Sequence, residues 1–174
     1  ILEEAFSCSN YLHDVVLPNS LKGLRTSSFK SCDMLSDVYC LSPIPPFADI
    51  NTFEEGPAIR YLHVPKGKQD DYSKAQGWYV FNHIIDDIDP STALYTVLSL
   101  RSEGKYVEAL NFIDDHIGKQ SITPLEKAQM AIQRIMLSYQ IGKEDDIYTS
   151  ASTAITSTDI LTQTKDPQLL DQLL

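Results

Sequence analysis

The sequence has few of the features that mark membrane, disulfide-rich or nucleic-acid-binding proteins. No uninterrupted apolar stretch approaches the roughly 18 residues of a membrane-spanning helix. The three cysteines, Cys8, Cys32 and Cys40, form no C-x-x-C pair, which excludes a zinc ribbon and indicates free thiols in a reducing compartment. Lys and Arg number 14 against 24 Asp and Glu, so the net charge of −10 disfavours nucleic acid and anionic membranes as partners.

What is present is the composition of a globular protein. The 174 residues are 43% apolar and 22% charged, which is enough to form a hydrophobic core without disulfides or a metal. The chain begins at Ile1 without Met and without a basic segment followed by an apolar run, so we expect no signal peptide and a longer parent protein. These features predict a protein of the cytoplasm or of the cytosolic face of an organelle.

The distribution of proline divides the chain into three segments. Residues 43–67 hold five of the nine prolines and two of the seven glycines, so they cannot form one regular element. We therefore predict an N-terminal helical segment over 1–42, with helices at 1–17 and 27–41, and an extended linker docked on the domain over 43–70. Apolar residues at three- and four-residue intervals predict that residues 71–174 are helical, beginning with Trp78, Phe81, Ile84, Ile85 and Ile88.

The C-terminal half carries repeated helix-start signals. Asp89-Pro90, Thr123-Pro124 and Asp166-Pro167 each combine an N-cap oxygen with a proline at the first helical position. Glu126 completes a capping box with Thr123. Turns at Gly104 and Gly142 divide the intervals. The interval from Pro90 to Pro124 equals the length of a tetratricopeptide unit, about 34 residues.

Residues 104–110 read Gly-Lys-Tyr-Val-Glu-Ala-Leu, which resembles the turn and second-helix start of a tetratricopeptide (TPR) repeat. The resemblance covers residues 90–157 and is weak in the first-helix half, where Ala93, Thr96, Val97 and Leu100 replace the usual residues. It implies an all-α fold of antiparallel helical hairpins in series, a TPR-like α-solenoid fragment that continues beyond the chain end. The resemblance does not imply that the chain grips the C-terminal carboxylate of chaperones. TPR proteins that do so use Lys and Asn on the inner face of the first helices, and the corresponding residues here are Leu94, Tyr95 and Leu98.

Such hairpins would form a groove for a partner helix or peptide. Its candidate residues are those expected on the inner face of the first helices: Leu94, Tyr95, Leu98, Arg101, Gln129, Gln133 and Arg134. Acids expected near helix ends form a candidate rim that favours a partner with basic flanks: Asp86, Asp87, Asp114 and Asp115. Adjacent aspartates on a helix diverge, so these pairs alone predict no metal site.

No pattern in the sequence points to catalysis or to a cofactor. The four histidines form no H-E-x-x-H or H-x-x-x-H pair, and no local signature surrounds any cysteine. We predict a non-enzymatic scaffold or adaptor subunit of a larger hetero-complex, which binds another protein and neither nucleic acid nor the membrane interior. Two alternatives stay open: a structural cap of a longer solenoid, and an enzyme that uses Cys–His or carboxylate chemistry.

Overall fold

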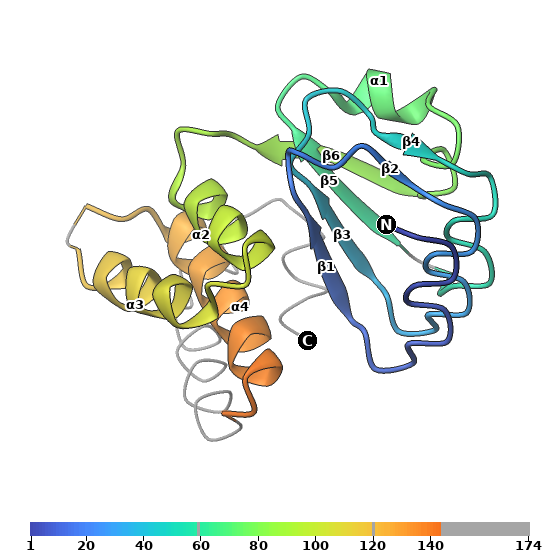
Figure 1. Cartoon of the computed structure of the whole chain (residues 1–174). Helices are drawn as coiled ribbons and strands as arrows, with labels where there is room; N and C mark the ends of the chain where they lie inside the picture. The colour runs from blue at the N-terminus through green and yellow to red at the C-terminus, as the bar shows by residue number, and fades with distance from the viewer. Residues whose placement is uncertain (59, 120, 144–174) are drawn as a thin grey trace. The chain divides into compact units, whose positions relative to one another are not determined.

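The computed structural model describes residues 1–58, 60–119 and 121–143, and the chain divides into two compact units. Unit 1 (Ile1–Pro90) is built on parallel β-strands, and the described part of unit 2 (Ser91–Leu174) is built on α-helices (Figure 1). The prediction of an all-α fold is therefore wrong.

Unit 1 is a β-solenoid-like stack of coils. Its main sheet has four parallel strands in the order β1 (Asp14–Leu17), β3 (Asp37–Cys40), β5 (Tyr61–Pro65) and β6 (His83–Ile88). A second, two-stranded parallel sheet pairs β2 (Gly23–Leu24) with β4 (Phe47–Ala48). The first aligned positions of the main sheet are Asp14, Asp37, Tyr61 and His83. Successive coils are therefore nearly equal in length.

Alternation along each strand separates the core from the outer face of the main sheet. Successive side chains of a strand point to opposite faces, and the register aligns equal faces of neighbouring strands. One set lies in the hydrophobic core of unit 1: Leu17, Val38, Cys40, Leu62 and Val64. The alternate set forms the outer face and is mostly aromatic or polar, with two aliphatic residues among its members: Asp14, Val16, Asp37, Tyr39, Tyr61, His63, His83, Ile85 and Asp87.

A ladder of phenylalanines joins the coils. Phe29 stacks on Phe6 at 5.1 Å and on Phe53 at 5.4 Å between ring centroids, so the three rings occupy equivalent places in successive coils. Backbone hydrogen bonds follow the same step, for example from Phe6 N to Ser28 O and from Phe29 N to Thr52 O. The aromatic and backbone ladders hold each turn of one coil against the next.

The third coil replaces the short strand with helix α1 (Gln69–Ser73) and a tight turn. Tyr72 and Trp78 are fully buried there, and the Trp78 indole N–H donates to Pro46 O at 2.8 Å. Gly77 has φ +78, and a Cβ at this position would lie 2.7 Å from Ala48 Cβ. Only glycine allows both this backbone conformation and the close approach of the turn to β4.

The helices predicted in the first 90 residues are absent there. Residues 1–17 and 27–41 form turns and strands, and Trp78 and Phe81 lie in a turn that leads to strand β6. A strand of four residues is too short to distinguish a period of 2 from one of 3.6. Apolar residues that lie three or four positions apart by chance were therefore interpreted as a helical pattern. Trp78 and Phe81 are nevertheless buried in the core.

Unit 2 contains three described helices: α2 (Ala93–Ser102), α3 (Tyr106–Ile117) and α4 (Pro124–Gln140). Gly104 has φ +73 in the predicted turn, and the Thr123–Glu126 capping box of α4 is confirmed. The N-cap of α2 is Thr92, so Pro90 does not begin that helix, and the match of the Pro90–Pro124 interval to a repeat length was a coincidence. The predicted start at Asp166-Pro167 lies outside the described residues.

The interpretation as a TPR-like α-solenoid is therefore wrong. Half of the chain is a parallel β-structure, and the described helices form one short group after it. In the part of the chain that the structure describes, no helix has the length and apolar character needed to cross a bilayer.

Candidate functional site

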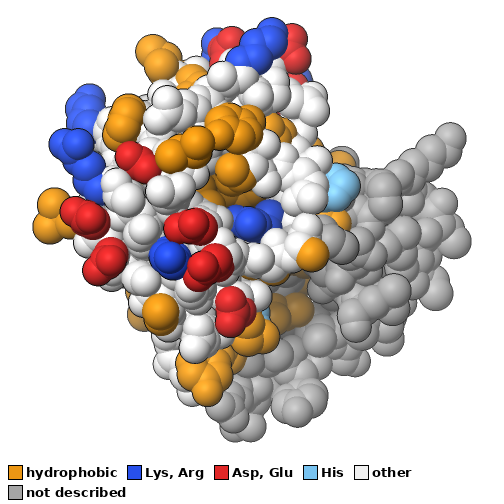
Figure 2. All heavy atoms as spheres, turned by 90° about the vertical axis from the view of Figure 1, so that its right-hand side faces the viewer, with side chains coloured by type: hydrophobic (Ala, Val, Ile, Leu, Met, Phe, Trp, Pro, Cys, Tyr) orange, Lys and Arg blue, Asp and Glu red, His pale blue; other side chains and the backbone are white. Residues whose placement is uncertain are grey.

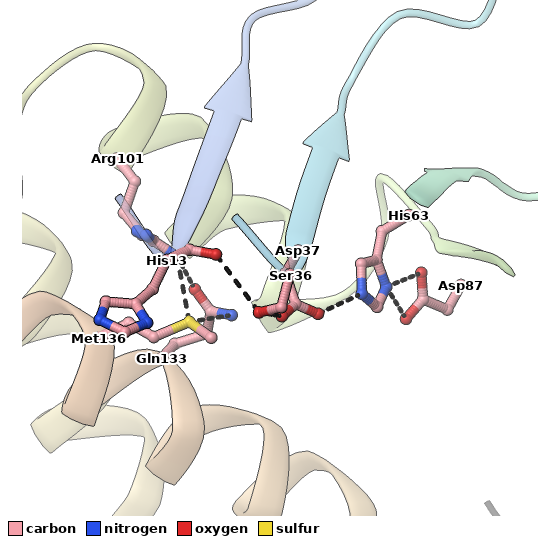
Figure 3. Close-up of polar contacts among 8 residues, drawn as sticks. All are labelled: His13, Ser36, Asp37, His63, Asp87, Arg101, Gln133 and Met136. Carbon is pink, nitrogen blue, oxygen red and sulfur yellow. Dashed lines mark hydrogen bonds and ion pairs between the residues drawn. The ribbon is translucent and has the colours of Figure 1, made fainter. Parts of the chain in front are cut away.

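The candidate groove residues on α2 are mostly inaccessible. Leu94, Leu98 and Arg101 are buried, and only Tyr95 is half-buried. Arg101 donates a hydrogen bond from Nη1 to Oε1 of Gln133 on α4, which is also buried (Figure 3). These side chains are thus enclosed and do not line an open groove in this structure.

The remaining candidates of unit 2 lie at its surface. Gln129 and Arg134 on α4 are half-buried, and Asp114 and Asp115 are exposed in the last turns of α3, as the sequence predicts. Arg134 donates from Nε to Asp114 Oδ1 at 2.8 Å. Because this pair satisfies one acid of the predicted rim, Asp114 is less available to steer a partner than its sequence position suggests.

The other two acids of the predicted rim belong to unit 1. Asp86 and Asp87 lie on β6 and not near a helix end. Asp86 Oδ2 accepts the backbone N–H of Gly67 at 3.0 Å, and Asp87 pairs with His63. The four acids of the predicted rim are thus divided between the two units, two on a strand of unit 1 and two on helix α3 of unit 2.

A buried histidine between two carboxylates stands on the outer face of the main sheet (Figure 3). His63 of β5 contacts Asp87 Oδ2 of β6 through Nδ1 at 3.0 Å, and Asp37 Oδ1 of β3 through Nε2 at 3.4 Å. Its ring stacks on Tyr39 at 4.3 Å. The Ser36 hydroxyl donates to the other carboxylate oxygen of Asp37.

These contacts set the charge of His63. Burial by itself would lower the pKa, because it removes water from the charged ring. The charges of Asp87 and Asp37 and their hydrogen bonds outweigh burial and raise the pKa of His63 to about 9. His63 is therefore an imidazolium at neutral pH, and it donates from both ring nitrogens.

This cluster joins strands, and its charged histidine is not available as a general base. An imidazolium with both N–H groups engaged has no lone pair with which to accept a proton. Ser36 directs its hydroxyl to Asp37 and not to the ring, so the cluster has no nucleophile–base pair. What the arrangement does is tie three neighbouring strands, β3, β5 and β6, through one cation.

The two buried thiols have contacts of their own. Cys32 and Cys40 are buried, and burial raises the pKa of both thiols, which keeps them protonated. Cys40 accepts a hydrogen bond from the Tyr72 hydroxyl at 3.1 Å, and Cys32 donates to Phe6 O at 3.1 Å. Among the described residues, no three His, Cys, Asp or Glu side chains are placed to hold a metal ion.

A groove with a volume of about 350 Å³ lies beside the small sheet of unit 1. Residues 42–47 form one wall, and Asn19, Leu21 and Lys22 form the other. The Ser42 hydroxyl donates to Ile44 O at 2.6 Å and closes a turn within the first wall. We call this feature the proline groove, because Pro43, Pro45 and Pro46 belong to its lining.

Large apolar side chains remain exposed at and near this groove. Ile44 is 74% exposed, Phe47 53% and Ile50 55%. On the face that Figure 2 shows, exposed hydrophobic side chains lie among acidic and basic ones. Three large apolar side chains exposed so close together in the chain are unusual for a protein surface that contacts only water.

No family model matches this chain, and neither a curated protein nor a solved structure does.

Sequence reasoning missed both features of unit 1. It left His63 without a role, because Asp37 and Asp87 lie 26 and 24 residues away and only the coil brings them together. It treated residues 43–70 as a linker to be docked, whereas Phe47 and Ala48 form a strand and the preceding prolines line a groove. A search for an internal period of about 23 residues, visible in the three phenylalanines of the ladder, could have found the coil.

Proposed function

We propose that this chain is a non-enzymatic protein-interaction scaffold or adaptor subunit, and that the proline groove with its exposed apolar side chains is the contact surface. The observation that carries the proposal is the exposure of three large apolar side chains. Ile44 and Phe47 line the groove, and Ile50 follows three residues after Phe47 in the sequence. In a chain of net charge −10, such exposure costs solubility unless a partner covers it.

The architecture supports the same proposal. The coils of unit 1 fall within the length range of leucine-rich repeats, about 20–29 residues. Stacked repeats of this kind provide rigid, extended surfaces that commonly bind other proteins. The His63 cluster strengthens the scaffold and does not supply a general base, because its histidine is charged at neutral pH.

The magnitudes favour apolar anchors as the source of affinity. Full burial of a side chain such as Ile44 or Phe47 contributes about 1.5–3 kcal/mol, whereas an exposed ion pair contributes about 0–1 kcal/mol. Loss of both anchors should therefore weaken a complex by at least about a hundredfold. Acidic residues would mainly affect the association rate of a partner with basic flanks.

The test compares proteins captured by three tagged forms of the chain. The groove variant carries Ile44→Ser and Phe47→Ser, and the control carries Leu2→Ser and Tyr11→Ser, two side chains that are 79% and 80% exposed. We expect at least one protein to be captured equally by the wild type and the control and to be absent from the groove variant. With purified components, the same protein should bind the wild type and the control more tightly than it binds the groove variant.

Circular dichroism and Trp78 fluorescence verify that all three forms are folded. If every captured protein binds the groove variant and the wild type equally, the proline groove is not the contact surface and the proposal is wrong.

A further inference from the structure

The proline groove has a charge asymmetry that points to a particular ligand. Its nine lining residues include one cation, Lys22, and no acid. Lys22 is exposed, and it makes no ion pair with any residue that the structure describes. Some other lysines of this acidic chain, though not Lys74, pair with carboxylates, for example Lys30 with Glu54 at 3.4 Å and Lys105 with Glu103 at 2.7 Å.

The hydrogen-bonding groups of the groove favour an acceptor of one negative charge. Three of its residues are prolines, which have no backbone N–H, and the Ile44 N–H already bonds to the Ser42 hydroxyl at 3.4 Å. The side-chain donors left at the opposite wall are the Lys22 ammonium and the Asn19 amide. One ammonium and one amide match a carboxylate better than a phosphate, which prefers several donors or an arginine fork.

The walls select an apolar group beside that carboxylate. Leu21, Ile44 and Phe47 line the groove, and its volume of about 350 Å³ suits one or two large side chains. The three prolines restrict the backbone of the wall formed by residues 42–47, so this segment loses little conformational entropy when a ligand binds.

We propose that the proline groove binds the C-terminal carboxylate of a partner peptide whose last residues are apolar. Lys22 and Asn19 hold the carboxylate, while Leu21, Ile44 and Phe47 contact the terminal side chains. This inference rests on the proposed function and deepens it, because it names the part of the partner that the surface recognises.

The test uses the peptide N-acetyl-Gly-Phe-Leu with a free carboxylate and the same peptide as its C-terminal amide. Each is titrated to millimolar concentration into the ¹⁵N-labelled full chain, and the amide resonances are followed by NMR. We expect shifts at Leu21, Lys22, Ile44 and Phe47. The amide should bind about three- to fivefold more weakly, the factor that up to about 1 kcal/mol of an exposed ion pair supplies.

Two lysine variants assign the difference to its cause. Lys22→Met keeps most of the aliphatic stem and should make the two peptides bind equally. Lys74→Met removes another exposed cation that has no ion pair among the described residues, and it should leave the preference for the carboxylate unchanged.

Equal binding of both peptides to the wild type, shifts outside the groove, or no shifts at all would overturn the inference. These outcomes leave the proposed function standing if the groove variant still loses its captured partner. Loss of the partner together with carboxylate preference supports both.

Discussion

At the residue scale, two positions of unit 1 carry contacts that no neighbour in sequence could supply. His63 is held between carboxylates from the strands on either side, and Gly77 is pressed against β4 in a left-handed conformation. Each position leads to a separate prediction about the stability of unit 1. Unfolding can be followed by fluorescence in both cases, because Trp78 is the single tryptophan and lies in the core of unit 1.

His63 should make the stability of unit 1 depend on pH. Its pKa is raised from 6.5 to about 9 in the folded chain, so its contribution is complete below pH 6.5 and is lost as the pH rises through 9. Between pH 6.5 and 8.5 the free energy of unfolding should fall by roughly 2 kcal/mol. Urea titrations followed by Trp78 fluorescence measure this change.

His63→Gln is the control for that prediction, since glutamine keeps hydrogen-bonding capacity and does not titrate. The variant should be less stable at pH 6.5 and nearly independent of pH up to 8.5. An unchanged pH dependence in the variant would show that other groups cause it.

Gly77→Ala should destabilise unit 1 by about 2–4 kcal/mol, because a Cβ meets Ala48 and Asp49 and the residue must keep a positive φ. Both nearest contacts, Ala48 Cβ and Asp49 O, would lie at 2.7 Å. Gly67→Ala is a matched control, because Gly67 has φ +76 with nothing within 4 Å of a Cβ. It should cost only about 1 kcal/mol. Equal losses in urea midpoint for the two variants would contradict the role of close approach.

At the element scale, the coils of unit 1 are held together by the main sheet and by the phenylalanine ladder. The short strands alone supply few backbone hydrogen bonds, since β1 and β3 have four residues each. Turn residues repeat in the same positions of successive coils: Cys8, Ser31 and Glu55 all have positive φ and lie one coil apart. The turns are thus as regular as the strands.

Phe29→Ala should reduce the stability of unit 1 by about 3–5 kcal/mol, the usual cost of removing a buried aromatic ring. Phe29 is 1% exposed and stacks on both neighbours of the ladder. Phe6→Ala, at a ring that is 41% exposed and stacks on Phe29, should cost clearly less. Guanidinium titrations of both variants compare the two positions, and a larger loss for Phe6 would show that the ladder is not the main contact between coils.

At the scale of the whole molecule, the division at Pro90 predicts that unit 1 folds without unit 2. Its main hydrophobic cluster draws only on residues between Ile1 and Ile84. A fragment of residues 1–90 should show dispersed NMR amide resonances and one cooperative unfolding transition detected by Trp78. Collapsed resonances or the absence of a transition would show that unit 1 needs the rest of the chain.

The sequence by itself determined the local features of this protein. The capping box at Thr123 and Glu126, the turn at Gly104 and the helices that follow it depend on residues within a few positions of one another. Such signals act through the nearest backbone groups, so they can be identified without knowing the fold.

Only the tertiary structure decided the architecture of the first 90 residues and the candidate site. Each short strand gains its stability from partners a whole coil away in the sequence, and its four or so residues are too few to show a period of two. The His63 cluster draws on three strands, and the proline groove joins residues 19–22 to residues 42–47. These contacts arise when successive coils stack, and their energy lies in long-range packing that no local pattern contains.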